Sequence, residues 1–118
     1  MITEEEKSKY GLPEHLFDEE FIVTEDFSKW IKKCDDHKRL IEVVVKCWDG
    51  DGREHEFELK THSNKTIWSF YTLGLSHNES IVRSLKNSSL WALYWYMECR
   101  GGYFELKIPK KLYSELEL

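Results

Sequence analysis

The sequence predicts a single α+β domain in which a mostly antiparallel, five-stranded sheet carries helices on one side. The chain has 118 residues, a length that suits one domain with a core of its own. Some segments are rich in β-branched and aromatic residues, as strands are, whereas others repeat apolar residues at helical spacing. The two prolines, Pro13 and Pro109, lie near the ends and leave the middle without that breaker.

The N-terminal segment is expected to hold two short helices. Residues 3–10 form a charged helical turn that Gly11 closes. Pro13 can open a second helix, because its ring fits the first helical turn, and this helix would carry Leu16 and Phe17.

Residues 25–34 give the strongest helical pattern. Thr24 can cap the helix, and acidic residues at its start and lysines at its end suit the helix dipole. One apolar stripe recurs at helical spacing: Phe27, Trp30, Ile31 and Cys34. The charged run that follows, up to Arg39, is expected to be a connector.

The stretch KCWDGDGREHEFE, residues 46–58, is expected to be the tip of a hairpin with strands at about 40–48 and 53–61. A three-residue loop at Gly50–Gly52 places Val45 opposite Phe57 and Lys46 opposite Glu56. One face is then apolar and the other carries opposite charges. A shift by one residue mixes the two faces, so the pattern selects this register.

The same stretch partly matches a calcium-binding EF-hand loop, with Asp49, Asp51, Gly52 and Glu58 at fitting positions. The first ligand position falls on Cys47, a soft sulfur that a hard cation avoids. The flanks are rich in β-formers, whereas an EF-hand needs helices. We therefore expect a hairpin and no metal site.

Residues 65–73 are expected to form the third strand. Ser76 and Glu79 match a capping box, which predicts a helix from there to about Lys86. Its inward face would hold Ile81, Val82 and Leu85.

The segment LWALYWYMECRGGYFELKIP, residues 90–109, predicts a second hairpin around a two-residue Gly101–Gly102 turn. A helix over residues 90–100 is the alternative. In the hairpin register, Cys99 faces Phe104. A last short helix is expected over residues 110–116.

The expected order of elements is α-β-β-β-α-β-β-α. This order is similar to that of the dimeric chaperones of type III secretion effectors, which are also small and acidic. The resemblance implies a chaperone-like dimer as one alternative function, and it leaves a homodimer open.

The negative charge of the chain is concentrated at one end. The formal net charge is -5, yet residues 1–26 hold nine acids against two lysines, a net of -7. Such a block suits a basic partner protein or a solvated arm, and it disfavours direct binding of nucleic acid. The expected contact residues are Asp18, Glu19, Glu20, Glu25 and Asp26, with Leu16, Phe17 and Phe21 as apolar anchors beside them.

The second predicted hairpin supplies another candidate surface. Glu98 and Glu105 come out directly opposite each other, on a face shared with Tyr94, Tyr96, Arg100 and Tyr103. Tyrosine and arginine are enriched where proteins bind one another. Alternatively, two carboxylates at close range can divide the roles of acid and base, as in a small enzyme or ligand-binding domain. A third interpretation is that Arg100 and Lys107 neutralise a solvated pair.

Other chemical signals are weak. Cys47 opposite His55 lacks a third group to orient a nucleophile and base. Cys34 and His37 have metal-like spacing but lack a second pair of ligands. No cofactor is expected. The start, MITEEEKSKYGLPE, contains no signal peptide, no membrane segment follows, and three sparse cysteines suit reduced thiols, so a cytoplasmic protein is expected.

The sequence thus predicts a small, acidic, non-enzymatic protein that binds and neutralises a basic partner protein. Immunity proteins of toxins and phage-encoded inhibitors of host nucleases or defence systems are of this kind. The small enzyme and the chaperone-like dimer are the alternatives.

Overall fold

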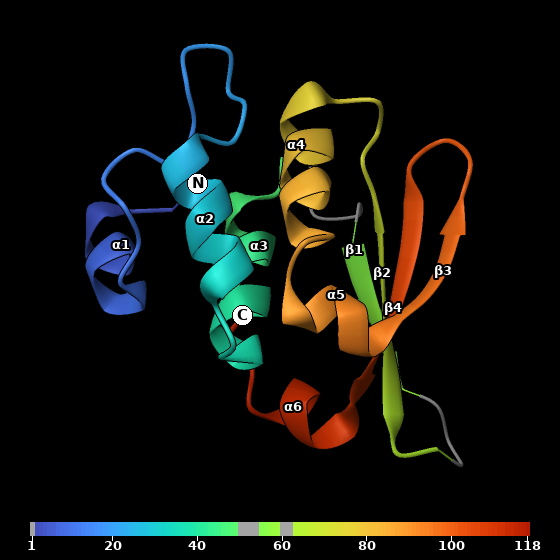
Figure 1. The fold of residues 1–118 in the computed structure, drawn as a ribbon. Helices are drawn as coiled ribbons and strands as arrows, with labels where there is room; N and C mark the ends of the chain where they lie inside the picture. The colour runs from blue at the N-terminus through green and yellow to red at the C-terminus, as the bar shows by residue number, and fades with distance from the viewer. Residues whose placement is uncertain (1, 50–54, 60–62) are drawn as a thin grey trace.

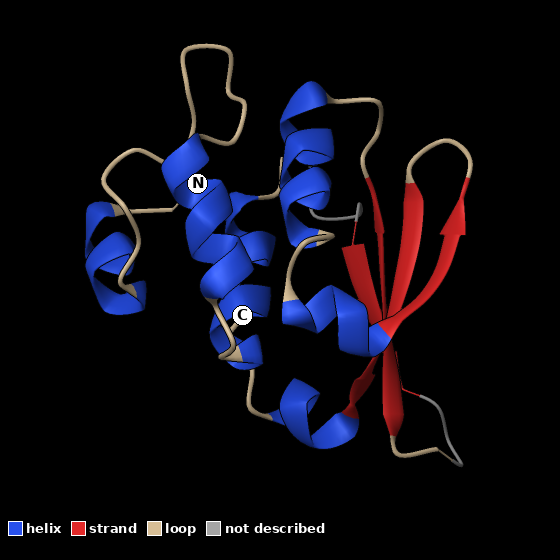
Figure 2. Ribbon diagram, in the orientation of Figure 1, coloured by secondary structure: helices blue, strands red, loops and turns tan. Residues whose placement is uncertain are grey.

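The computed structural model describes residues 2–49, 55–59 and 63–118, and within them it is an α+β structure. Its elements are α1 (Glu4–Tyr10), α2 (Glu25–Lys33), α3 (His37–Cys47), β1 (His55–Leu59), β2 (Lys65–Tyr71), α4 (Ser76–Leu85), α5 (Ser89–Tyr94), β3 (Trp95–Cys99), β4 (Tyr103–Pro109) and α6 (Lys110–Ser114). The strands form one antiparallel sheet in the order β1-β2-β4-β3, and the helices lie on one side of it (Figure 1 and Figure 2).

The predicted α+β class is confirmed, but the described sheet has four strands rather than five. The predicted order of elements is wrong as well. Among the described residues, three helices precede β1, and two helices, α4 and α5, lie between β2 and β3. The resemblance to secretion chaperones depended on that order, so the structure removes its basis.

The largest error concerns the segment predicted as the first strand, which forms helix α3. Asp36 caps it by accepting a hydrogen bond from the Arg39 N–H at 3.1 Å. Its run of β-branched residues resembles a strand, but apolar side chains around most of the helix are buried: Leu40, Ile41, Val43, Val44 and Cys47. Burial thus overrides the intrinsic preference of this segment for a strand.

The predicted first hairpin is therefore wrong. Strand β1 pairs instead with β2, so that Phe57 faces Trp68. Lys46 lies on α3 and forms an ion pair with Glu6 at 3.0 Å. The predicted tip at Gly50–Gly52 lies outside the described residues.

Helices α1 and α2 confirm the prediction, with Gly11 closing the first in a left-handed conformation (φ 67°) and Thr24 capping the second. The predicted helix from Pro13 is wrong. Its backbone bonds run across a loop, as from the Thr24 N–H to the Leu16 carbonyl at 2.9 Å. Helix α4 begins at Ser76 as predicted, but its N-cap residue forms no side-chain bond, so the capping box is absent.

The second hairpin exists, but its register differs from the prediction by one residue. Cys99 faces Tyr103, Glu98 faces Phe104, and a bulge follows Trp95. The turn contains three residues instead of two, and both of its glycines adopt positive φ (88° and 81°). The alternative, a helix over residues 90–100, is correct only for its first part: α5 covers Ser89–Tyr94, and strand β3 follows.

The core lies between the sheet and the helices. Alternate residues of β4 point inward, namely Phe104, Leu106 and Ile108, and they face Phe70, Trp68 and Thr66 of β2. The Phe57 and Trp68 rings stack at 5.7 Å, and the Trp68 and Phe70 centroids are 4.8 Å apart. The aromatic layer lies on the face that the helices cover. In the described part of the chain, no helix covers the opposite face of the sheet (Figure 2).

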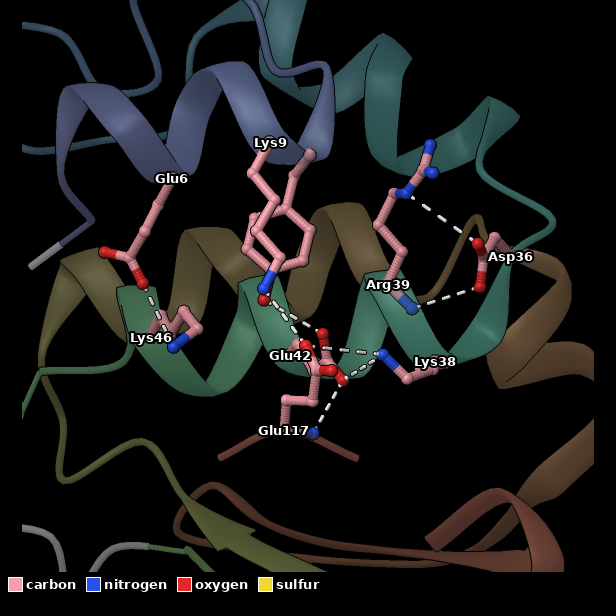
Figure 3. Close-up of polar contacts among 9 residues, drawn as sticks. Glu6, Lys9, Asp36, Lys38, Arg39, Glu42, Lys46 and Glu117 are labelled. Carbon is pink, nitrogen blue, oxygen red and sulfur yellow. Dashed lines mark hydrogen bonds and ion pairs between the residues drawn. The ribbon is translucent and has the colours of Figure 1, made fainter. Parts of the chain in front are cut away.

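One carboxylate, that of Glu42 on α3, lies inside the helical layer with 1% of its surface exposed (Figure 3). It accepts hydrogen bonds from the Tyr10 hydroxyl at 2.9 Å and from the backbone N–H of Glu117 at 2.7 Å. The Lys38 ammonium lies 2.9 Å away. Burial raises the pKa of Glu42, but the bonds from Glu117, Lys38 and Tyr10 outweigh it, so the pKa is lowered.

Glu42→Gln should lower the free energy of unfolding at pH 7 by about 2–4 kcal/mol, because Lys38 loses its buried counter-charge. The folded pKa of Glu42 lies below its ordinary 4.5, so its contribution is present above that value and is lost as the pH falls through the folded pKa. The difference between wild type and variant should therefore shrink at pH 3.

Urea unfolding at the two pH values measures both effects. Glu79→Gln, which changes an exposed carboxylate on α4, is the matched control and should remain close to wild type. Equal stability of wild type and Glu42→Gln at pH 7 would contradict this role for the buried charge.

Candidate protein-binding surfaces

The acidic loop, residues 17–23, is tightly turned. Phe17 and Val23 form an antiparallel bridge at its base. The Asp18 carboxylate accepts hydrogen bonds from the backbone N–H groups of Glu20 at 2.9 Å and Ile22 at 3.0 Å. Asp18 therefore holds the turn together, which is a structural role that the sequence did not reveal.

Phe21 stands at the tip of this loop in an unfavourable conformation. Its φ is 61°, in the left-handed region, where a residue with a Cβ atom costs about 1–2 kcal/mol. Its side chain is nevertheless 61% exposed, so packing does not explain the phenylalanine. Residues held in this way cluster at functional sites, which makes Phe21 the central residue of the candidate surface.

His77, in the first turn of α4, fixes the loop from below. Its two ring nitrogens lie 2.8 Å from the Phe21 carbonyl and 2.7 Å from the Cys47 carbonyl. Both partners are carbonyl oxygens, which accept hydrogen bonds, and the tautomer of the ring decides which nitrogen donates. The Phe17 ring packs 4.3 Å from the imidazole, and the Ser80 hydroxyl accepts the Val23 N–H at 3.1 Å.

Asn78 brings the end of α3 to the same place. Its side-chain oxygen accepts the Asp49 N–H, and its amide nitrogen donates to the Asp49 carbonyl, each at 2.9 Å. An open cavity of about 460 Å³ lies between these segments, lined by Glu20, Phe21, Asp49, Leu75, Ser76 and His77. Apolar and acidic side chains thus stand side by side around it.

The acids of residues 1–26 fall into two groups. The first group forms ion pairs with helical lysines. Glu6 pairs with Lys46, and Glu25 pairs with Lys29 at 3.1 Å. The Thr3 backbone N–H, followed by Lys46, lowers the pKa of Glu6 to about 2.

Within the described part of the chain, the exposed Glu19 and Glu20 have no ion pair. Two other predicted contact acids, Glu25 and the exposed Asp26, lie in the first turn of α2, where their negative charge suits the helix dipole. Among the predicted contact acids, Glu19 and Glu20 are those that lie outside α2 and do not hold the turn, as Asp18 does.

The predicted hairpin surface is only partly assembled. Tyr96, Tyr103 and Glu105 do share the uncovered face of the sheet, where the Tyr103 hydroxyl donates to the Glu105 carboxylate. That bond, with a smaller effect of burial, raises the pKa of Tyr103 to about 12. The Lys107 ammonium lies 3.7 Å from the centre of the Tyr96 ring.

The other predicted members of that surface lie elsewhere. The Tyr94 ring, at the end of α5, meets the edge of the His37 ring at 5.4 Å. Glu98 forms an ion pair with Lys86 at 2.9 Å, and Arg100 is exposed in the turn. In the observed register, Glu105 faces Met97 and not Glu98, so the predicted carboxylate pair is wrong.

The cysteine hypotheses receive no support from the geometry. Cys47 is buried on α3, and burial raises the pKa of its thiol to about 12, opposite to what a nucleophile needs. The Cys34 thiol contacts the Asp36 carbonyl at 3.5 Å, whereas His37 contacts the Ser89 hydroxyl at 3.0 Å.

Among the residues that the structure describes, no group of three or more potential ligands could hold a metal ion. Nor does any helix in those ranges have the length and apolar character needed to cross a bilayer. The chain matches no protein-family model, no curated protein and no solved structure. The function proposed below rests on the geometry of the surfaces.

Sequence reasoning missed four residues of the cavity and its support: Asp49, Leu75, His77 and Asn78. His77 and Asn78 act on segments 56 and 29 residues away in the sequence, so no local pattern reveals them. A local signal did exist for the turn, because an aspartate often accepts the N–H two residues ahead, as Asp18 does from Glu20.

Phe21→Gly should be more stable than Phe21→Ala by about 1 kcal/mol. Both variants lose the ring, but only glycine relieves the left-handed backbone, and alanine retains the Cβ atom. Thermal and urea unfolding of both variants beside wild type measure the difference. If alanine were as stable as glycine at this position, the loop would not carry the strain described here.

Proposed function

We propose that the protein binds another protein through the acidic loop and neutralises it, as an immunity protein does to a toxin or a phage-encoded inhibitor to a host nuclease or defence system. The observation that carries this proposal is Phe21, which is exposed and held at positive φ next to Glu19 and Glu20, two acids without an ion pair among the described residues. The Phe21 ring meets His77 at its edge, with 6.4 Å between the ring centroids, but most of its surface stays exposed and can serve a binding site as a rigid apolar anchor.

The charge of the surface defines the chemistry of the partner. Glu19 and Glu20 directly precede the anchor in the chain, and Asp49 lines the same cavity as Glu20 and Phe21. Carboxylates without local counter-charges attract lysine and arginine side chains and accelerate the encounter with a basic protein. The basic cleft of a nuclease, which binds phosphates, is complementary to such a surface.

The enzyme alternative loses its main support, since Glu98 and Glu105 do not face each other. The proposal therefore includes no catalysis and no cofactor, and it excludes direct contact between the acidic loop and nucleic acid. A cytoplasmic location is part of the proposal, because the free thiols of Cys34, Cys47 and Cys99 suit a reducing compartment.

Reversing Glu19 and Glu20 to lysine should reduce the association rate with the partner by about tenfold or more and flatten its dependence on salt. The exposed charges act over a screening length of about 8 Å at physiological ionic strength. Asp18 is left unchanged, because its carboxylate holds the loop. The partner is captured from lysate of the source cells on immobilised wild type, and the rates are then measured at several salt concentrations.

The matched control reverses Glu56 and Glu115, two exposed acids outside the loop, and changes the net charge by the same amount. The control should bind nearly as fast as wild type. Equal slowing by both double variants would mean that net charge, and not the acidic loop, drives association.

Phe21→Ala should chiefly accelerate dissociation, by about tenfold or more, because a buried aromatic anchor contributes to residence time rather than to encounter. Leu118→Ala, which truncates an exposed leucine at the other end of the chain, is the control. Unchanged dissociation of Phe21→Ala would remove the loop tip from the interface.

A further inference from the structure

The edge strand β3 is an unusually open element. It lies at the end of the sheet, next to β4 only, and all five of its residues are exposed. The exposed fractions are 52% for Trp95, 46% for Tyr96 and 37% for Met97, and Leu93 just before them is 64% exposed. An edge strand also presents backbone donors and acceptors ready to pair with another strand.

The two edges of the sheet differ in composition. Proteins usually protect an edge with charged side chains or proline, and β1 does carry the exposed Glu56 and Glu58. Strand β3, with the sequence WYMEC, has no lysine or proline and one acid, Glu98, which Lys86 neutralises. A bulge after Trp95 is its only irregularity among the residues described. Strand β3 is thus the less protected edge.

The distribution of charge indicates a second copy of this chain as the occupant. The acidic segment, with α1 and the loop before α2, lies on the side of the molecule opposite to β3 (Figure 1). Around β3 both signs are present, with Lys86, Arg100 and Lys107 beside Glu98 and Glu105. Two copies of an acidic protein can therefore approach at this edge while their acidic segments stay far apart.

The exposed apolar area at β3 supplies part of what a dimer contact covers. Fully covered aromatic side chains contribute about 150–250 Å² each, so the exposed halves of Trp95 and Tyr96 offer on the order of 200 Å². Leu93, Met97 and the backbone edge add to this area. A stable interface covers about 800 Å² per partner, and a two-fold axis uses the same residues on both copies.

We propose that two copies pair β3 with β3 in antiparallel fashion about a two-fold axis, which joins their sheets into one. The dimer covers the apolar edge and carries the acidic loops at its two far ends. It holds two binding sites for the partner, and neither site is part of the dimer contact.

Sedimentation velocity on the full chain over a micromolar concentration series tests the proposal. Wild type should be a dimer, and Trp95→Lys should weaken the dimer by tenfold or more, because the change occurs twice in a two-fold contact. Met97→Lys is a second variant should Trp95→Lys fail to fold, as circular dichroism would reveal. The control is Leu59→Lys, which places the same charge at a 57% exposed residue on the other edge strand.

A monomeric wild type across the series overturns the proposal, as does a dimer that Leu59→Lys weakens and the β3 variants do not. These outcomes leave the proposed function untouched, because a monomer can still bind a basic partner through its acidic loop. Conversely, a dimer that binds no basic partner overturns the proposed function alone.

Discussion

The buried carboxylate of Glu42 is the interaction on which the helical layer depends. It draws hydrogen-bond donors from α1, from its own helix and from the C-terminal segment, and each donor satisfies a charge that could not remain unpaired in that position. Helix α3 is thereby fixed, and its last carbonyl, that of Cys47, is one of the two acceptors that hold His77. His77 in turn holds Phe21. A continuous series of polar contacts thus connects the core of the protein to its candidate binding loop.

The parts of the fold that the sequence predicted are those with local signals. Thr24 and Gly11 mark the ends of helices by their own chemistry, and the alternation in β4 defines its inward face. Helix α3 could not be recognised, because a helix buried on nearly all sides has the same apolar composition as a strand. What distinguishes it is the group of partners around Glu42, and two of these, Tyr10 and Glu117, lie 32 and 75 residues away in the sequence. The register of the second hairpin depended on one residue of turn length, which two adjacent glycines do not specify.

The candidate site shows the same division. The acidity of the loop and the presence of Phe21 are visible in the sequence, whereas the backbone conformation that exposes Phe21 follows from bonds made across the tertiary structure. Under the proposed function, Phe21 is a compromise between stability and recognition, because backbone strain accompanies an apolar ring exposed among carboxylates. The acidic loop and the β3 edge lie on opposite sides of the molecule, so one can be occupied without obstructing the other (Figure 1).

The bond between Tyr10 and Glu42 gives the protein a built-in optical probe. Burial and the neighbouring carboxylate raise the pKa of Tyr10 far above the value near 10 that exposed tyrosines show. In an alkaline titration its phenolate absorbance should therefore appear after that of the exposed tyrosines. The contribution of this bond to stability is present below pH 10 and is lost as the pH rises through the folded pKa. Tyr103 also ionises late, so the signal of Tyr10 is the late absorbance that remains in a Tyr103→Phe variant. Its shift to lower pH would report the separation of α1 from α3, without any label attached to the chain.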